Sequence, residues 1–307
     1  MPTINRPVFI IGCPRSGTGL LHNLMRLHPD FAWITPLTNW ICGKSWFRSV
    51  PPHLAHVADE VLHHLPPFVR PRFLRGPYDG SVQAAGVLPT HEGHSIWNRF
   101  CPRRPHHACR SDAVSPPARS VLRDVVRWHL RYHRRPRFVT KTPRNALRMP
   151  FFQAIFPDVQ FIHLVRDGRA VAASILKMRR KMYGTVHHWW GARPPGWQDV
   201  QADPPIIQAA WMWSSFLETI DQDAARLPHD SVYTLRYEQL TRRPRETMRA
   251  LFQAVGVAPE RFLHSEYDAV VSKIRPPHEG WREQLTDTQK SLLSTIRPKL
   301  RAYGYLE

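Results

Sequence analysis

The sequence lacks the features that identify disulfide-stabilised or membrane-spanning proteins. Its 307 residues include four cysteines and no Cys-x-x-Cys pair, so a reducing compartment is expected rather than a disulfide framework. No stretch approaches the ~20 apolar residues of a membrane span. The segment Met1–Pro7 is too short and too polar to be a signal peptide. These absences predict a soluble, cytoplasmic protein.

Paired metal-ligand spacing is also missing. One cluster, which resembles a basic surface loop, contains Cys101, His106, His107 and Cys109. A second cluster has His91 and His94 on either side of Glu92, without the spacing that puts two imidazoles on one helical face. We therefore expect no metal.

Acidic residues are scarce. Lys and Arg number 43 against 24 for Asp and Glu, which gives a formal net charge of +19 and favours anionic partners. The basic residues are mostly dispersed arginines, and no block is long enough to predict a nucleic-acid partner. With 42% hydrophobic residues, residues 1–307 can form one domain with a sizeable core.

Two segments have the pattern of a strand, a loop and a helix, near residues 8–27 and 160–178. Val8–Gly12 is apolar and β-rich, and leucines at helical spacing follow its glycine-rich loop. Gln160–Val165 has the same character, breaks at Arg166-Asp167-Gly168 and resumes as a helix. Two such switches imply parallel strands.

Further elements complete the predicted fold. Strands are expected at Arg137–Thr140 and Ser231–Leu235, and a helix at Ile206–Leu227. Regions 37–117 and 183–205 are rich in Pro, His and Trp, and we expect loops and short helices there. The pattern predicts an α/β fold with a P-loop-like parallel sheet of about five strands flanked by helices, and ligands at the carboxyl ends of the strands.

The loop from Arg15 to Leu20 points to an anion site. A turn between a strand and a helix aims backbone N–H groups and the helix dipole at one point. A P-loop that hydrolyses nucleotides ends in Gly-Lys-Ser/Thr, whereas Thr18 and Gly19 occupy those last two positions here. Arg15, Ser16 and Thr18 can still donate to a phosphate or sulfate without a metal, although glycine-rich turns also occur for packing reasons.

Two motifs are similar to those of the sulfotransferase superfamily. Pro14-Arg15-Ser16-Gly17-Thr18 resembles its 5′-phosphosulfate loop, and Leu164–Ser174 resembles its 3′-phosphate-binding segment. The resemblance implies 3′-phosphoadenosine 5′-phosphosulfate as the sulfuryl donor. It implies contacts to that donor from Arg15, Ser16, Gly17, Thr18, Gly19, Leu20, Arg166 and Ser174.

Further matches extend over most of the chain. Phe138–Pro143 is similar to the family's central strand end with its lysine, here Lys141, and Val232–Leu240 resembles its "RYEDL" stretch, which places Tyr237 in the donor site. Lys273–Arg275 and Gly280–Arg282 resemble a basic segment that closes over the donor. They are equally compatible with a basic loop that packs Trp281 on the core.

The expected chemistry assigns three catalytic candidates. Sulfuryl transfer requires in-line positioning and stabilisation of charge on the bridging oxygen, which the resemblance assigns to Arg15 and Lys141. The histidine that acts as base in cytosolic relatives is replaced by Pro143, and no glutamate follows the first helix. Glu92 is our predicted general base. The alternative is a loop in which Glu92 only pairs with an arginine.

The predicted function is transfer of a sulfuryl group to a hydroxyl or amine of a carbohydrate, lipid or small molecule. Tryptophans could line such an acceptor pocket, and the segment His187–Trp190 is either its gate or an exposed loop. Two alternatives are a P-loop nucleotide-dependent kinase and a non-catalytic anion-binding module. The sequence does not predict the oligomeric state.

Overall fold

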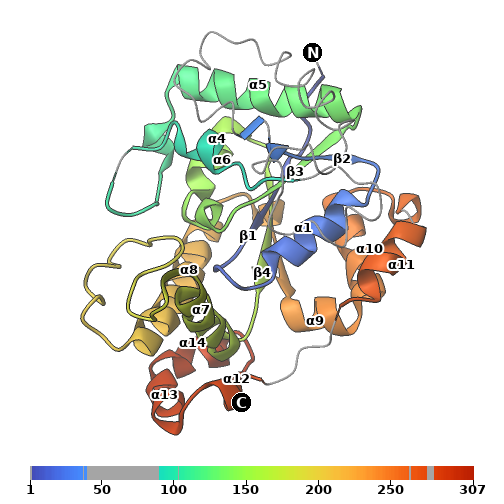
Figure 1. Ribbon diagram of the computed structural model, residues 1–307. Coiled ribbons are helices and arrows are strands. Elements are labelled where there is room, and N and C mark those ends of the chain that lie inside the picture. The colour runs from blue at the N-terminus through green and yellow to red at the C-terminus, as the bar shows by residue number, and fades with distance from the viewer. Residues whose placement is uncertain (1, 37, 40–89, 103, 263, 275–279) are drawn as a thin grey trace.

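A computed structural model describes residues 2–36, 38–39, 90–102, 104–262, 264–274 and 280–307. Five parallel strands form one sheet in the order β2-β3-β1-β4-β5 (Figure 1). The strands are β1 (Val8–Ile11), β2 (Phe31–Ala32), β3 (Arg137–Lys141), β4 (Gln160–Val165) and β5 (Val232–Arg236). The predicted fold class is confirmed. The sequence analysis gave residue ranges for four of these strands and did not predict β2.

Helices make up most of the remaining described chain. They are α1 (Thr18–Arg26), α4 (His94–Asn98), α5 (Pro116–His133), α6 (Met149–Ile155), α7 (Gly168–Tyr183), α8 (Pro205–Ala224), α9 (Tyr237–Arg242), α10 (Pro244–Val255), α11 (His264–Val271), α12 (Trp281–Gln284), α13 (Asp287–Leu292) and α14 (Arg297–Ala302), with a 3₁₀ turn at Pro143–Leu147. The predicted helix at Ile206–Leu227 corresponds to α8.

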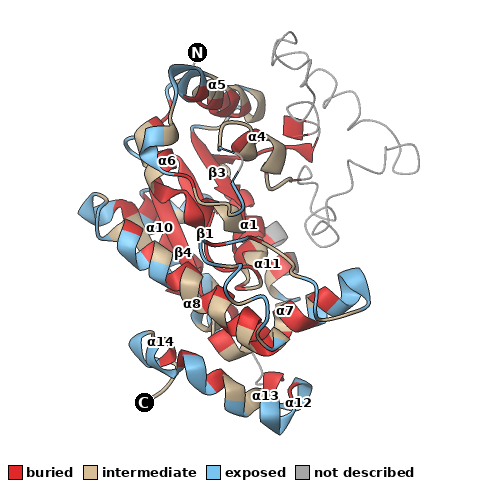
Figure 2. Ribbon diagram, turned by 90° about the vertical axis from the view of Figure 1, so that its left-hand side faces the viewer, coloured by how far each residue is buried: buried red, intermediate tan, exposed pale blue. Residues whose placement is uncertain are grey.

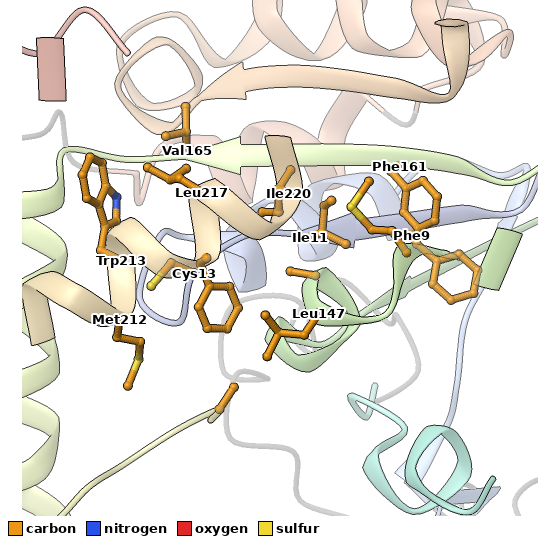
Figure 3. Packing of buried hydrophobic residues seen from close by; sticks show 14 of the residues in the cluster. Phe9, Ile11, Cys13, Leu147, Phe161, Val165, Met212, Trp213, Leu217 and Ile220 are labelled. Carbon is orange, nitrogen blue, oxygen red and sulfur yellow. The ribbon is translucent and has the colours of Figure 1, made fainter. Parts of the chain in front are cut away.

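Side chains of the sheet alternate between two helical layers. In β1, Val8 and Ile10 join a core with α1, α9, α10 and α11. Phe9 and Ile11 point to the opposite face and join a core with α5, α6, α7 and α8. Figure 3 shows this second core, in which Ile11 lies beside Ile220 of α8 and Phe9 lies beside Phe161 of β4. Because both faces are covered, the strands are apolar throughout, as expected for a parallel sheet.

The strand order brings three loops to one edge. β1 lies between β3 and β4, with Ile10 opposite Lys141 in one register and Ile11 opposite His163 in the other. The carboxyl ends of these three strands therefore carry the Arg15 loop, Lys141 and Arg166 side by side. The central strands that position them are buried (Figure 2).

Some predictions fall on parts of the chain without a description. Residues 40–89 include one of the four cysteines, Cys42, and two of the tryptophans considered for the acceptor pocket, Trp40 and Trp46. Arg275, from the basic segment Lys273–Arg275, is likewise outside the described residues. Within the described ranges, no helix is long and apolar enough to cross a membrane. The single domain over residues 1–307 and the cytoplasmic location stay predictions.

Candidate functional site

A cavity of about 660 Å³ opens at the carboxyl ends of the central strands. Its walls come from the glycine-rich loop, β3, the β4–α7 junction and the segment after α7. The lining residues are Pro14, Arg15, Gly17, Thr18, Gly19, Leu20, Glu92, His94, His107, Lys141, Pro143, Arg144, Arg166, Tyr183, Trp189, Trp190, Gly191, Ala192, Arg193 and Tyr237. The structure thus brings most of the predicted site residues to one place.

The glycine-rich loop has a backbone that fits closely against its surroundings. Arg15 has φ 73° and Gly17 has φ 93°, both in the left-handed region, where a residue other than glycine is uncommon. A Cβ atom on Gly17 would lie 2.3 Å from Cδ2 of Tyr237. The left-handed Gly17 is also where the chain turns into α1. Only glycine therefore lets the loop lie against the Tyr237 ring.

Arg15 and Arg166 are linked to each other and to α7. The Arg15 Nε donates to Ser174 Oγ at 3.0 Å. Arg166 donates from Nη1 to the Arg15 carbonyl oxygen at 3.2 Å, and its guanidinium lies 4.4 Å from the centroid of the Tyr237 ring. We call Arg15–Leu20, Arg166, Ser174 and Tyr237 the donor half of the cavity, because the sequence analysis predicts donor contacts from them. Ser16 and Ser174 are absent from the cavity lining, and Ser16 is buried.

A network holds the start of α7 behind Arg166. The Asp167 carboxylate caps the helix by accepting from the Arg169 N–H at 2.9 Å. The Asp167 N–H donates to Glu238 Oε1 at 3.2 Å, and Glu238 Oε2 accepts from the Tyr305 hydroxyl at 2.8 Å. Arg236 donates to the Tyr303 carbonyl. Arg236 and Glu238 of the "RYEDL"-like stretch therefore anchor the C-terminal segment.

At the centre of the cavity, Lys141 forms an ion pair with Glu92. The Lys141 and Glu92 side chains are 5% and 23% exposed. Glu92 Oε2 also lies 2.9 Å from His94 Nε2, and His94 Nδ1 lies 3.2 Å from Thr142 Oγ1. The predicted alternative partner of Glu92 was an arginine, and the observed partner is the predicted catalytic lysine.

The ionisation of Glu92 is governed by opposing effects. Burial by itself would raise the pKa of the Glu92 carboxyl, but the charge of Lys141 and the contact with His94 hold that pKa well below its ordinary value. In this arrangement Glu92 is ionised and its negative charge is compensated. A carboxylate in that condition binds a proton weakly.

A buried histidine beneath this pair was missed by the sequence reasoning. His22 of α1 lines a second, smaller cavity of about 210 Å³ together with Glu92 and Lys141. Burial, followed by the charges of Arg26 and Lys141, lowers the pKa of His22 well below its ordinary value. In the sequence, His22 is one residue of the leucine-rich helical pattern after the loop, and nothing in that pattern indicates that it lies near Glu92 and Lys141.

The rest of the cavity wall is formed by residues from separate segments. Pro143 stands where cytosolic relatives carry their base, and Arg144 follows it. His107 and Arg193 come from two loops, and Trp190 lies beside Arg193 in the lining. We call His107, Arg144, Trp190 and Arg193 the acceptor half, after the acceptor pocket that the sequence analysis predicts. Trp189 and Trp190 line the cavity, whereas His187 and His188 are exposed and do not, so the gate at 187–190 stays a prediction.

Two other sequence features have structural roles. Trp281 is buried against the core and its ring lies 4.8 Å from the Arg169 guanidinium carbon, which matches the packing alternative for Gly280–Arg282. Cys101 and Cys109 are free thiols. Among the described residues, no group of three or more His, Cys, Asp or Glu side chains is arranged to hold a metal ion.

Comparisons with known proteins show the family of this chain. A sequence model described as the sulfotransferase family matches residues 7–261. The chain is 24% identical over 264 residues to omega-hydroxy-beta-dihydromenaquinone-9 sulfotransferase Stf3 of Mycobacterium tuberculosis (strain CDC 1551 / Oshkosh), which covers 82% of this chain and 63% of that protein. It is 22% identical over 318 residues to the protein-tyrosine sulfotransferase of Drosophila melanogaster, covering 97% and 51%. The chain therefore spans less than two thirds of these curated relatives.

Solved structures share the fold. Sulfotransferase STF9 from Mycobacterium avium superposes with a TM-score of 0.56 at 15% identity, covering 98% of this chain and 78% of that one. The sulfotransferase domain of the Synechococcus PCC 7002 olefin synthase gives a TM-score of 0.50 at 17% identity, covering 96% of both chains. At these identities the likeness concerns the fold alone.

Proposed function

Since the chain belongs to the sulfotransferase family, we propose that it transfers a sulfuryl group from 3′-phosphoadenosine 5′-phosphosulfate to a hydroxyl or amine of a carbohydrate, lipid or small molecule. The named relatives act on different acceptors, a hydroxylated menaquinone in one case and protein tyrosine in another. They therefore do not select an acceptor class for this chain.

The observation that best supports the proposed donor is that two groups able to bind anions, the glycine-rich loop and Arg166, line the same cavity. The glycine-rich loop and the start of α1 offer backbone N–H groups and a helix N-terminus to one phosphate. Arg166, at the end of β4, offers a guanidinium to a second, and Ser174 lies within hydrogen-bond distance of Arg15. A nucleotide with phosphates at both its 5′ and 3′ positions would offer one anion to each of these two sites.

The Lys141–Glu92 pair suggests how the base could be activated. An incoming phosphosulfate offers Lys141 a new anionic partner next to Arg15. When Lys141 turns toward that partner, Glu92 loses the charge that keeps its pKa low, and burial then raises the pKa. Glu92 would become an effective base only when the donor is in place.

In the transfer itself, Glu92 accepts the proton of the acceptor hydroxyl while the acceptor oxygen bonds to sulfur. The bond from sulfur to the bridging oxygen breaks, and the electron pair stays on the departing 3′-phosphoadenosine 5′-phosphate. Arg15 and Lys141 stabilise the charge that develops on that oxygen.

Calorimetric titration tests the donor. We expect 3′-phosphoadenosine 5′-phosphate to bind without magnesium and ATP to bind weakly with or without it. Magnesium-dependent ATP binding in place of nucleotide bisphosphate binding would support a kinase and refute the proposal. Tight bisphosphate binding by a chain that turns over no donor with any acceptor would instead favour a non-catalytic module.

Replacement of Arg166 tests whether this residue binds the 3′-phosphate. Arg166→Ala should weaken 3′-phosphoadenosine 5′-phosphate binding about 10- to 100-fold, because hydrogen bonds to charged groups contribute about 1.5–3 kcal/mol. Adenosine 5′-monophosphate, which lacks the 3′-phosphate, should bind the variant and the parent protein alike. An equal loss for both nucleotides would mean that Arg166 supports the loop rather than binding the 3′-phosphate.

A further inference from the structure

The acceptor half of the cavity is strongly basic and lacks acidic side chains. Arg144, Arg193 and His107 line it, and Glu92 is the one carboxylate among the described lining residues. Glu92 is already engaged by Lys141 and His94. Arg144 and Arg193 therefore share this one carboxylate with Lys141 and His94, and the wall facing the acceptor carries an excess of positive charge.

Arg144 is a cation without a direct partner. It is half-buried, and it makes no hydrogen bond or ion pair with any other residue that the structure describes. Burial, followed by the charge of Arg148, lowers the pKa of Arg144, and the charge of Arg193 adds to that shift, whereas the charge of Glu92 opposes it. Removing a guanidinium from water without supplying an anion is unfavourable. A bound anion would supply the missing interaction.

The surrounding chain fixes Arg193 near this site. The Arg193 N–H donates to His107 Nδ1 at 2.7 Å, and the His107 N–H donates to the Arg193 carbonyl oxygen at 2.8 Å. Arg148 Nε donates to the His107 carbonyl at 2.9 Å, and the Arg193 guanidinium lies 4.6 Å from the Trp197 ring centroid. The main-chain contacts hold the two loops together, and the exposed Arg193 side chain lines the cavity with its guanidinium packed on Trp197.

His107 does not add to the positive charge of the acceptor half. Burial, followed by the charges of Arg144, Arg148 and Arg193, lowers the pKa of His107 to about 3, so the imidazole is neutral near pH 7. That neutral ring accepts the Arg193 N–H through Nδ1, which leaves the proton on Nε2. The positive charge on this wall therefore comes from Arg144 and Arg193.

We propose that the acceptor carries an anionic group, a carboxylate or a phosphate or sulfate ester, which Arg144 and Arg193 bind while the acceptor hydroxyl faces Glu92. This inference rests on the proposed function and deepens it by naming a class of acceptor. The donor's phosphates already have Arg15, Arg166 and the loop N–H groups. Arg144 and Arg193 belong to other segments and remain available to a second anion.

The test uses protein saturated with 3′-phosphoadenosine 5′-phosphate, so that the donor half is occupied. Calorimetry in a chloride buffer compares 4-hydroxybenzoate with its methyl ester, two ligands with the same ring and hydroxyl. We expect the acid to bind at least about tenfold more tightly, since charged hydrogen bonds contribute about 1.5–3 kcal/mol. Arg144→Gln and Arg193→Gln should each reduce that preference.

Two variants make the result specific. Arg249→Gln removes the same charge from the exposed surface of α10, away from the cavity, and should leave the preference unchanged. Arg144→Lys keeps the charge and should retain part of it. Equal binding of acid and ester, binding of neither, or a preference that survives in Arg144→Gln would overturn the inference.

The outcome is separable from that of the proposed function. If the nucleotide bisphosphate binds and the acid shows no preference, only the acceptor inference fails. If the bisphosphate does not bind, the proposed donor fails, and the preference for the acid can still be measured on the empty protein. The affinity of each variant for the bisphosphate reports whether the substitution has disturbed the donor half.

Discussion

The donor half and the acceptor half of the cavity are built in different ways. The donor half follows directly from β1 and β4, and its side chains bond to one another and to main-chain atoms, as in Arg15 with Ser174 and Arg166 with the Arg15 carbonyl. The acceptor half draws on a 3₁₀ turn and two loops, and Arg144 makes no hydrogen bond or ion pair there with any described residue. The proposed donor site is therefore held by contacts within the protein, whereas the proposed acceptor site has fewer such contacts.

The largest effect should come from breaking the close fit of the donor half. Gly17→Ala would add a Cβ in the left-handed region and against the Tyr237 ring, which Arg166 covers. We expect a loss of about 3 kcal/mol in the free energy of unfolding, from backbone strain and overpacking together. Urea denaturation measures this loss, and bisphosphate binding should weaken with it.

Gly184→Ala is the matched control for that variant. Gly184 also has a positive φ, at 72°, but an added Cβ would meet no atom within 4 Å. Its cost should be only about 1 kcal/mol, from backbone strain alone. If the two variants lost equal stability, the fit between the loop and Tyr237 would not be the source of the effect.

An intermediate effect is expected at Glu92, where the two halves meet. Glu92→Gln leaves Lys141 without its ion pair and should lower the free energy of unfolding at pH 7 by about 1–3 kcal/mol. The folded pKa of Glu92 is lowered, so the pair stabilises the protein fully above the unfolded carboxyl's pKa, near 4.5. This stabilisation is lost as the pH falls from there toward the folded pKa.

Urea titrations at pH 7 and pH 3.5 check this prediction. The difference in stability between the parent protein and Glu92→Gln should shrink at the lower pH. Glu218→Gln is the control, because Glu218 pairs with Lys299 on the surface and such pairs contribute about 1 kcal/mol or less. A difference for Glu92→Gln that is unaffected by pH would contradict the ion-pair explanation.

The smallest effect belongs to the acceptor half. Trp190 is half-buried and lines the cavity, whereas Trp189 is fixed by donation from Nε1 to the Ala192 carbonyl at 3.1 Å. Trp190→Ala should weaken 4-hydroxybenzoate binding about 3- to 10-fold, as expected for the loss of one aromatic contact. Calorimetry on bisphosphate-saturated protein measures it. A comparable loss of bisphosphate affinity would mean that Trp190 belongs to the donor half.

The sequence predicted the donor half because its information is local. A strand, a loop and a helix follow one another in each of two segments, so the sequence alone predicts that Arg15 to Leu20 and Arg166 to Ser174 follow the ends of parallel strands. β2 was missed because Phe31–Ala32 is too short to show a periodic pattern. Its strand character comes from its register with β3.

The acceptor half was not predictable in the same way. His107, Arg144 and Arg193 are far apart in the chain, and none of them lies in a motif that marks a site. Only the fold shows that they share a wall. The partner of Glu92 illustrates the same limit, since the position of Lys141 was predicted but its ion pair joins residues 49 apart.

The contact between Tyr305 and Glu238 has a consequence for studies of motion in this protein. Glu238 accepts a hydrogen bond from the Tyr305 hydroxyl with one oxygen and from the Asp167 amide with the other. If residues 303–307 detach, the carboxylate is free to reorient and the amide beside Arg166 becomes open to solvent. Deuterium uptake at Asp167 would therefore report the docking of a segment that is remote from it in the chain.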